Sequence, residues 1–258
     1  MTPDVLSARD GGIATVTLFN PEKLNALDAA MWRRLAAVFA ELDADEALRC
    51  VILRGEGAAF AAGGDLVEMQ AARATVDGAL AYHGQVAGAL DAIAACRHPV
   101  IAQIVGPCVG GGLEIACACD LRIAGESARF GAPIARLGFS MYPGELAGLL
   151  RVAGSAVVKE ILLEARLLTA REAYEKGLLT RVVPDADVAA EAQATAQRIA
   201  AGAPLVARWH KQWIARLQQG APLSADELRA SFAFLDSADY REGVTAFLEK
   251  RPPHFTGH

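Results

Sequence analysis

Short apolar runs separated by glycine-bearing turns dominate the first part of the chain. Residues 5–8 and 13–18 are two such runs on either side of an Asp-Gly-Gly turn, and this pattern predicts a β-hairpin. Residues 28–42 then place apolar side chains at helical spacing behind Asp28, which is a favourable N-cap residue. Residues 50–54 are apolar again, so a hairpin, a helix and a further strand are expected here.

The middle of the chain repeats this alternation around a glycine triplet. Residues 99–105 form a continuous apolar and β-branched run that is typical of a buried strand. Gly110-Gly111-Gly112 follows, and a helix is expected from there to about residue 117, before another strand over residues 121–124. The rest of the chain is organised around this strand–turn–helix–strand unit. Two helical patterns precede it, over residues 66–73 and 75–95.

Helical patterns dominate from about residue 155, and the one short strand expected there covers residues 180–183. Residues 130–134 and 137–144 are expected to be irregular, before another helix. The sequence therefore predicts an α/β core over residues 1–190 and an all-helical region over residues 191–258. The helical ranges after residue 155 are 157–163, 170–176, 188–201, 205–218, 225–235 and 241–249.

Composition excludes several classes of function. Of the 258 residues 53% are apolar, enough for a substantial core, and the net charge of −5 leaves no basic footprint for nucleic acid. No signal-peptide pattern is visible, and no apolar stretch is long enough to span a membrane. The five cysteines lie in or beside apolar segments without the CxxC spacing of a zinc site. We therefore expect reduced thiols, no metal and a cytoplasmic protein.

The glycine triplet carries the candidate chemistry. The first N–H groups of a helix have no internal partner, so an oxygen that gains negative charge would be stabilised at Gly111. Glu114 lies three residues further on and projects from the same face. The alternative is that the triplet is only a tight turn and Glu114 a solvated side chain. The apolar residues on both sides of Glu114 favour burial, which would raise its pKa and suit proton transfer.

Six segments in a fixed order resemble one family. Together they cover nearly the whole chain, and on them the sequence is identified as a member of the crotonase superfamily, also called the enoyl-CoA hydratase/isomerase family. The segments are NPEKLNAL at 20–27, AFAAGGDL at 59–66, HPVIAQIVGPCVGGGLEIACACDLRIA at 98–124, ARFGAPIARLG at 128–138, LLTAREAYEKGLLTRVV at 167–183 and EGVTAFLEKRPPHF at 242–255.

The resemblance implies a fold, a ligand and an oxyanion hole. The fold would be a spiral of ββα units with a C-terminal helical region that helps form trimers, often paired into hexamers. The ligand would be an acyl-CoA thioester, with no further cofactor required. By motif position the two oxyanion-hole donors are the N–H groups of Gly64 and Gly111, and the acid–base residue is Glu114. The family more often has alanine at position 64, a difference not expected to matter for a main-chain donor.

The resemblance also assigns binding residues. Main-chain groups near Leu24 and Ala62 would hold the adenine, and Lys23 could either meet a phosphate or be a solvated turn residue. Val67 stands where a lysine is common, and Lys250 and Arg251, from this or a neighbouring subunit, are candidates to replace that contact. The substrate-binding residues expected in all are Lys23, Leu24, Ala26, Ala62, Asp65, Leu66, Gly110, Pro133 and Ile134.

One departure from the family pattern affects the reaction. Standard hydratases of the family use a second glutamate directly after the proline of an FGxPE pattern, and here Ile134 occupies that position. An isoleucine side chain can neither transfer a proton nor orient water. Glu145 or Tyr142 could reach the pocket instead, although Glu145 is also well placed as an N-terminal helix residue. His83 is a further candidate, with a surface or pocket-lining role as its alternative.

Three hypotheses follow, in order of preference. The first is an enzyme of enoyl-CoA hydratase/isomerase type with Glu114 as its acid–base residue. The second is a different reaction on the same scaffold, such as decarboxylation, thioester hydrolysis or C–C bond chemistry, as Ile134 would allow. The third is a non-catalytic acyl-CoA-binding protein.

Overall fold

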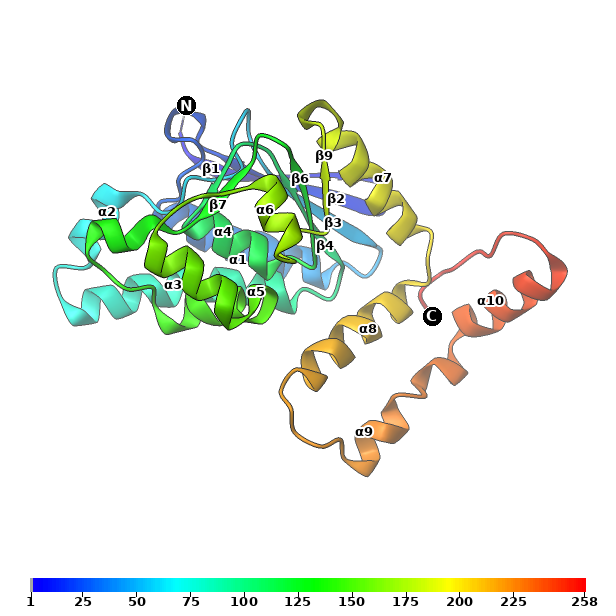
Figure 1. Cartoon of the computed structure of the whole chain (residues 1–258). Coiled ribbons are helices and arrows are strands. Elements are labelled where there is room, and N and C mark those ends of the chain that lie inside the picture. Colours follow the sequence, from blue (N-terminus) through cyan, green and yellow to red (C-terminus); the bar gives the residue numbers. More distant parts are fainter. Residues whose placement is uncertain (1) are drawn as a thin grey trace.

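Two sheets form the framework of the protein, for which a computed structural model describes residues 2–258 (Figure 1). The larger sheet has six strands in the order β1-β2-β3-β4-β6-β9, and every pair in it is parallel except the β1–β2 hairpin. Its strands are β1 (Asp4–Asp10), β2 (Ile13–Phe19), β3 (Cys50–Gly55), β4 (Val100–Ile104), β6 (Leu121–Gly125) and β9 (Arg181–Val183).

A smaller sheet stands beside the glycine triplet. It has the order β5-β7-β8, with β5 and β7 parallel and β7 and β8 antiparallel. Its strands are only two or three residues long, too short for a period-two pattern, and for this reason the sequence did not predict them. They are β5 (Pro107–Val109), β7 (Arg129–Gly131) and β8 (Leu168–Thr169).

Helices cover both faces of the large sheet. Two of them begin at clear side-chain caps: Asp28, the cap expected from the sequence, accepts from the N–H of Met31, and Thr169 forms a full capping box with Glu172. The helices are α1 (Ala29–Ala44), α2 (Leu66–Ala72), α3 (Val76–Ala95), α4 (Gly111–Ala118), α5 (Pro143–Glu164), α6 (Ala170–Glu175), α7 (Val188–Ala200), α8 (Pro204–Leu217), α9 (Ala225–Ala230) and α10 (Ala238–Glu249).

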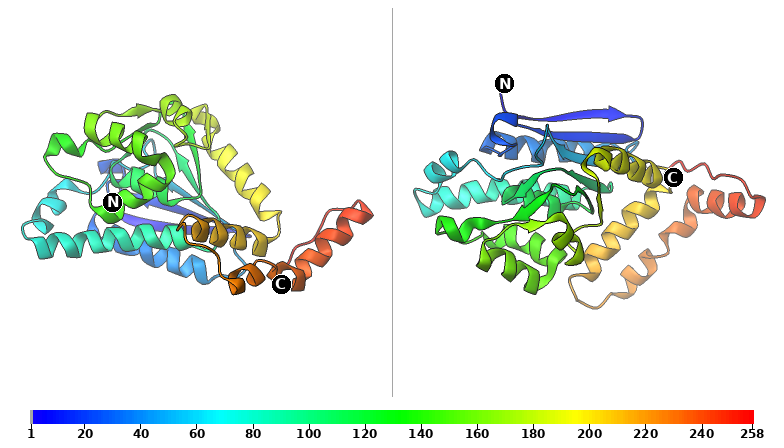
Figure 2. Two further views of the ribbon diagram at one scale, coloured as in Figure 1. Left: turned by 60° about the horizontal axis from the view of Figure 1, so that its bottom comes forward. Right: turned by 45° about the horizontal axis from the view of Figure 1, so that its top comes forward.

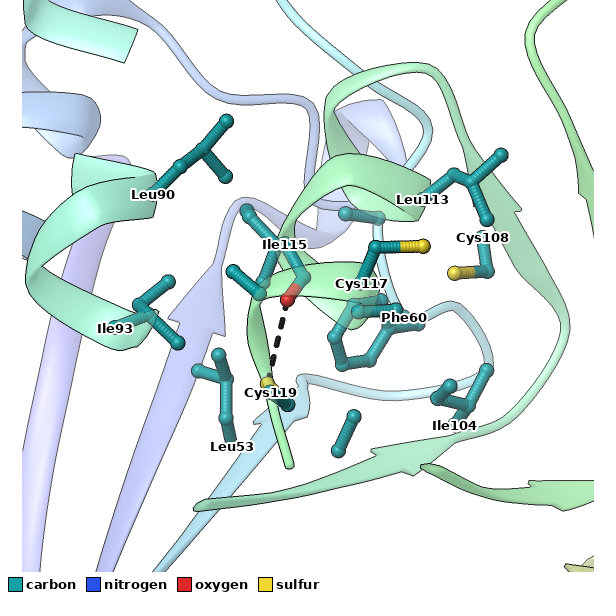
Figure 3. Close-up of a cluster of buried hydrophobic side chains, with 14 of the residues drawn as sticks. Leu53, Phe60, Leu90, Ile93, Ile104, Cys108, Leu113, Ile115, Cys117 and Cys119 are labelled. Carbon is teal, nitrogen blue, oxygen red and sulfur yellow. Dashed lines mark hydrogen bonds between the residues drawn. The ribbon is translucent and has the colours of Figure 1, made fainter. Parts of the chain in front are cut away.

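The main core lies between the sheet and helices α1, α3 and α4. Figure 3 shows part of it, with side chains of β3, α3 and α4 packed together and the Cys119 thiol donating to the Ile115 carbonyl over 3.3 Å. Every residue of α4 is buried. Each large apolar side chain buried in this way contributes about 1.5–3 kcal/mol to the free energy of folding. Because all of its residues are buried, α4 is held in place from all sides.

Helix α7 packs on the other face of the large sheet. Its Ala192 and Ala196 are buried in a second, smaller cluster of apolar side chains. The remaining helices are α8 to α10: α8 keeps contact with the body of the fold, where Lys211 pairs with Asp120, while α9 and α10 extend away from the sheets (Figures 1 and 2). These three helices expose large apolar side chains, among them Ile214, Leu217, Phe247 and Leu248. A division of the chain at residue 190 stays a prediction.

The observed elements differ from the predicted ones in three places. The stretch expected to be irregular contains β7 and a 3-10 helix over Pro133–Leu137. Helix α5 begins at Pro143, just inside the stretch expected to be irregular, and non-helical dihedral angles at Gly154 divide it into the helix expected after residue 144 and the one expected over residues 157–163. The helix expected over residues 225–235 is divided into α9 and a 3-10 turn at Ala233–Asp236.

Membrane-spanning helices, metal-ligating groups and disulfides are three features that the sequence did not favour, and the structure of residues 2–258 bears on each of them. No helix within residues 2–258 is long and apolar enough to cross a membrane. No group of three or more metal-ligating side chains occurs among these residues either. All five cysteines are free and buried.

Candidate active site

The two glycine-bearing loops meet at the N-terminal end of α4. The N–H groups of Phe60 and Ala61 both donate to the Pro107 carbonyl, and the Val109 N–H donates to the Ala61 carbonyl over 3.0 Å. A methyl group added at Gly112 would lie only 2.3 Å from that same Ala61 oxygen. The glycine is therefore required because the two backbones approach too closely for a side chain.

The backbone leaves two N–H groups free at this junction. Gly111 is the first residue of α4, behind Gly110, which adopts a φ of +53° that favours glycine. Gly64 lies opposite Leu27 in a short parallel bridge, but the bonds of the bridge are made by the residues on either side of it. Leu27 donates to the Gly63 carbonyl, and Asp65 donates to the Leu27 carbonyl. Among the described residues, neither the Gly64 N–H nor the Gly111 N–H has a hydrogen-bond partner.

A cavity of about 190 Å³ opens at these groups. It contains most of the site residues expected from the sequence, from both loops, α4 and the 3-10 helix after β7. Those that line it are Ala62, Gly64, Leu66, Gly110, Gly111, Glu114, Pro133 and Ile134. The further lining residues are Trp32, Gly63, Met69, Arg73, Tyr82, His83, Val86, Val109, Leu137, Phe139, Met141 and Glu145.

Four expected binding residues do not line the cavity. They connect the segment over residues 23–26 to the glycine-bearing loop over residues 62–66. The Lys23 ammonium forms an ion pair of 2.5 Å with Asp65, which also caps α2. This pairing raises the pKa of Lys23 and lowers that of Asp65. The Leu24 carbonyl accepts from the Ala62 N–H over 3.0 Å, and Ala26 is buried beside them.

A side chain at position 64 would contact two neighbouring side chains of the cavity wall. A methyl group at this position would lie 2.8 Å from the Met69 sulfur and 3.1 Å from the Tyr82 hydroxyl. Both distances are shorter than ordinary van der Waals contact, because Met69 and Tyr82 fill the space that an alanine would need. The Met69 sulfur lies near the end of a flexible side chain, so a small shift would relieve that contact, and the equivalence of alanine and glycine as main-chain donors at this position stays a prediction.

Glu114 is the buried acid of the cavity, and its expected burial is confirmed. Its residue exposure is 8%, and its carboxyl group has no hydrogen-bond partner within residues 2–258. Burial raises its pKa well above the ordinary glutamate value. The negative charge of Glu145 adds to this increase, while the positive charge of Arg73 opposes it.

A second polar group lies in the same cavity wall, built from three elements. The Arg73 guanidinium, at the C-cap of α2, contacts His83 Nε2 of α3 at 3.0 Å and 3.2 Å. His83 Nδ1 forms a short hydrogen bond with the carboxylate of Glu145, in the first turn of α5. The His83 ring also stacks on Tyr142 at a centroid distance of 5.0 Å.

The whole chain matches a known family. Residues 8–258 fit the model of the Enoyl-CoA hydratase/isomerase family. The chain belongs to this family. It is 35% identical over 257 residues to a probable enoyl-CoA hydratase of Mycobacterium bovis, covering 98% of this chain and 97% of that protein. A probable enoyl-CoA hydratase of Rhizobium meliloti is 36% identical over 256 residues, covering 97% of each chain.

Solved structures of the enoyl-CoA hydratase/isomerase family agree with the fold. A protein of Magnetospirillum magneticum described as an enoyl-CoA hydratase/carnithine racemase has 50% identity and a TM-score of 0.97, covering 98% of this chain and 96% of that one. A putative enoyl-CoA hydratase/isomerase family protein of Hyphomonas neptunium has 37% identity and a TM-score of 0.93, covering 98% of both. The predicted crotonase-like α/β fold is confirmed.

The cavity differs from the family pattern at the position of the second glutamate. Ile134 lines the wall there, packed against the apolar core, so an aliphatic side chain replaces a carboxyl group. Tyr142, one of the substitutes considered from the sequence, contacts His83 but does not line the cavity. Glu145 is both an N-terminal helix residue and part of the cavity wall, so its two alternatives hold together.

The sequence missed several cavity residues for a common reason. Arg73 lies at the end of a short helix without any motif, and its guanidinium packs 4.2 Å from the centre of the Phe139 ring. Tyr82 is adjacent to His83, and burial raises the pKa of its hydroxyl to about 12. The place of these side chains depends on how α2, α3 and α5 pack together, and no local pattern contains that information.

Proposed function

We propose that this protein is an acyl-CoA-processing enzyme in which the N–H groups of Gly64 and Gly111 donate to one thioester carbonyl oxygen. The single observation that carries this proposal is that Gly64 and Gly111, each with an unpaired N–H group, line one cavity from separate loops. Glu114, on the helix that begins at Gly111, serves as the acid–base residue beside them. Membership in the enoyl-CoA hydratase/isomerase family supports the same substrate class.

The chemistry follows from where charge develops. When a proton leaves Cα, or a nucleophile adds at Cβ, the thioester carbonyl becomes an enolate-like oxyanion. Two fixed N–H donors stabilise this oxygen more than they stabilise the neutral carbonyl, so they lower the barrier. Loss of one such donor costs about 3–4 kcal/mol of transition-state stabilisation in comparable sites. A protonated Glu114 can supply the proton that an enolate carbon needs.

The loops behind the cavity would hold the CoA moiety. Lys23 to Ala26 and Ala62 to Leu66 are tied together by the Lys23–Asp65 ion pair and by the bond between Leu24 and Ala62. Main-chain groups near Leu24 and Ala62 would contact the adenine. No cofactor beyond the thioester substrate is proposed. The Arg251 guanidinium is engaged by Glu242 and Glu249 of its own chain, which weakens the case for it as a phosphate ligand.

The family resemblance further supports a homotrimer or a dimer of trimers. The apolar side chains exposed on α8 and α10 are consistent with such an assembly, because contiguous exposed apolar surface marks an interaction site. The five free cysteines agree with a reducing compartment, and we propose the cytoplasm.

Glu114→Gln tests the catalytic assignment. The amide keeps the size of the side chain but cannot exchange a proton, so turnover of crotonyl-CoA should fall by about 10²–10⁴-fold. Binding of a non-reactive CoA thioester, measured by calorimetry, should persist. Glu126→Gln is the matched control, since Glu126 is exposed at the surface. Full activity of Glu114→Gln would remove the assignment.

The second candidate function is another reaction on the same scaffold. The specific observation that favours it is Ile134, which replaces the second carboxyl group. A panel of enoyl-, β-hydroxyacyl- and malonyl-type CoA esters separates the two candidates. Conversion of the enoyl and β-hydroxyacyl esters alone supports the hydratase/isomerase reaction. Conversion of the malonyl type, or release of free CoA, supports the other candidate.

A further inference from the structure

Three polar residues that line the cavity together with Glu114 are Arg73, His83 and Glu145, and their hydrogen bonds have a defined order of donors and acceptors. Arg73 has only N–H groups to offer, so His83 Nε2, which contacts two of its nitrogens, accepts and carries no proton. A neutral imidazole then carries its proton on Nδ1 and donates it to Glu145. The tautomer inferred from these partners makes the Glu145 carboxyl group an acceptor, as it is when ionised.

Two features stabilise the ionised form of Glu145. Its position in the first turn of α5 puts it at the positive end of the helix dipole. The Arg73 charge also lies one imidazole ring away, and Arg73 lines the same cavity. Burial of a carboxylate is otherwise unfavourable, and hydrogen bonding with a nearby opposite charge offsets that cost.

Glu114 and Glu145 therefore share one cavity in opposite protonation states. Two buried carboxylates facing each other repel, so one of them keeps its proton. Glu114 lacks a hydrogen-bond partner among residues 2–258, whereas Glu145 has His83. The resting cavity then contains one positive charge, Arg73, and one negative charge, Glu145. This balance assigns the proton to Glu114.

The proposal concerns the carboxyl group that is missing at position 134. We propose that Glu145 is the second acid–base catalytic residue of this site, and that His83 and Arg73 are the positioning residues that orient it. The inference rests on the proposed function, since it needs an acyl-CoA substrate in the cavity. Glu145 reaches the cavity from the start of α5, while Ile134 lies on the preceding 3-10 helix. The same wall thus regains a carboxyl group from a different element.

For hydration of an enoyl thioester the two carboxyl groups divide the work. Ionised Glu145 takes a proton from water as the water oxygen bonds to Cβ, and the Cα–Cβ π electrons move toward the carbonyl oxygen held by Gly64 and Gly111. Protonated Glu114 then gives its proton to Cα. One water is added in total, and transfer of a proton from Glu145 back to Glu114 through solvent restores the starting state.

Glu145→Gln is the decisive variant. Glutamine keeps an oxygen that can accept from His83 Nδ1, so a purely structural network would survive, but the side chain can no longer accept a proton. With crotonyl-CoA, kcat should fall by about 10²–10⁴-fold with little change in KM. Glu160→Gln is the control, because Glu160 lies on the same helix and pairs with Arg166 and Lys176 at the surface. It should keep wild-type kcat.

A rescue experiment separates a catalytic role from a structural one. Ile134→Glu in the Glu145→Gln background returns a carboxyl group to the cavity wall, and it should raise kcat at least tenfold over the single variant. Wild-type kcat in Glu145→Gln would overturn the inference and leave the proposed function intact. A low kcat without rescue, together with a lowered melting temperature, would also overturn it in favour of a structural network.

The positioning role of His83 has its own test. His83→Phe removes the Nδ1 donor, and His83→Asn places an amide N–H close to where that donor lies. We expect kcat to fall more than tenfold in His83→Phe and to recover in part in His83→Asn, with KM near the wild-type value in both. Equal kcat in both variants and the wild type would overturn this role. If the wild-type protein neither binds nor converts any CoA thioester, the proposed function fails as well.

Discussion

At the scale of single residues, Glu114 couples the site to the stability of the protein. Its raised pKa means that the folded state binds a proton more tightly than the unfolded chain does, so folding is favoured while Glu114 is protonated. This contribution is fully present below the ordinary glutamate pKa of 4.5 and is lost as the pH rises through the raised value. The loss amounts to about 1.4 kcal/mol for each pH unit crossed.

We therefore predict that Glu114→Gln is more stable than the wild type at neutral pH. A glutamine has no proton to lose, so its contribution stays constant, and the two proteins should have similar stability in mildly acidic buffer. Urea unfolding at several pH values measures the difference directly. A constant difference in unfolding free energy across the whole range would contradict the raised pKa.

How much of the site the sequence predicts depends on the kind of residue. Gly64, Gly111 and Glu114 stand in motifs whose local geometry fixes their place, and the cavity brings all three together. Arg73 and Glu145 do not stand in such motifs, because they reach the cavity only through the packing of α2 and α5. The contacts that a side chain at position 64 would make with Met69 and Tyr82 were invisible for the same reason, since they arise only in three dimensions.

At the scale of elements, α4 and the loop before Gly64 act as one unit because Gly112 lets them touch. We predict that Gly112→Ala lowers the unfolding free energy by about 1–3 kcal/mol, since the new methyl group overlaps the Ala61 carbonyl and the backbone must move. The shift would also separate the two N–H donors and lower kcat/KM for crotonyl-CoA.

Gly84→Ala is the control for this prediction. Gly84 lies inside α3, and a methyl group there would meet no heavy atom within 4 Å. An alanine should stabilise the helix by about 0.4–1 kcal/mol, because it reduces the entropy of the unfolded chain. Denaturant midpoints compare both variants with the wild type. If Gly112→Ala matched Gly84→Ala in stability, the close backbone contact would not limit this position.

Long helices were predictable from the sequence, and strands of two or three residues were not. Helices α1, α3 and α7 carry enough turns for the apolar stripe to be visible, and α1 and α3 also begin at the local side-chain caps Asp28 and Thr75. Strands β5, β7 and β8 exist only because each pairs with another, so their signal lies in partners far along the chain. The two helical stretches that the sequence predicts after residue 144 and over residues 157–163 are both present, on either side of the break at Gly154.

At the scale of the whole molecule, the C-terminal helices leave apolar surface exposed. Phe247 is 84% exposed and Leu248 74% exposed, both on α10. We predict that Phe247→Asp weakens self-association, because a charge at an apolar interface is costly to desolvate. Sedimentation velocity should show a shift to smaller species. Val76→Asp is the control, since Val76 is 76% exposed on α3 in the core region. An unchanged mass for Phe247→Asp would argue against α10 as part of the interface.

The complete burial of α4 has a consequence for how the enzyme meets its substrate. The helix carries Gly111 at its first position and Glu114 one turn later, and the surrounding core fixes both before any ligand arrives. On the proposed function, an incoming thioester would find dipoles already aimed, and no part of its affinity would be needed to order this wall of the cavity. Such preorganisation is expected to favour the reacting state over the resting one from the first encounter.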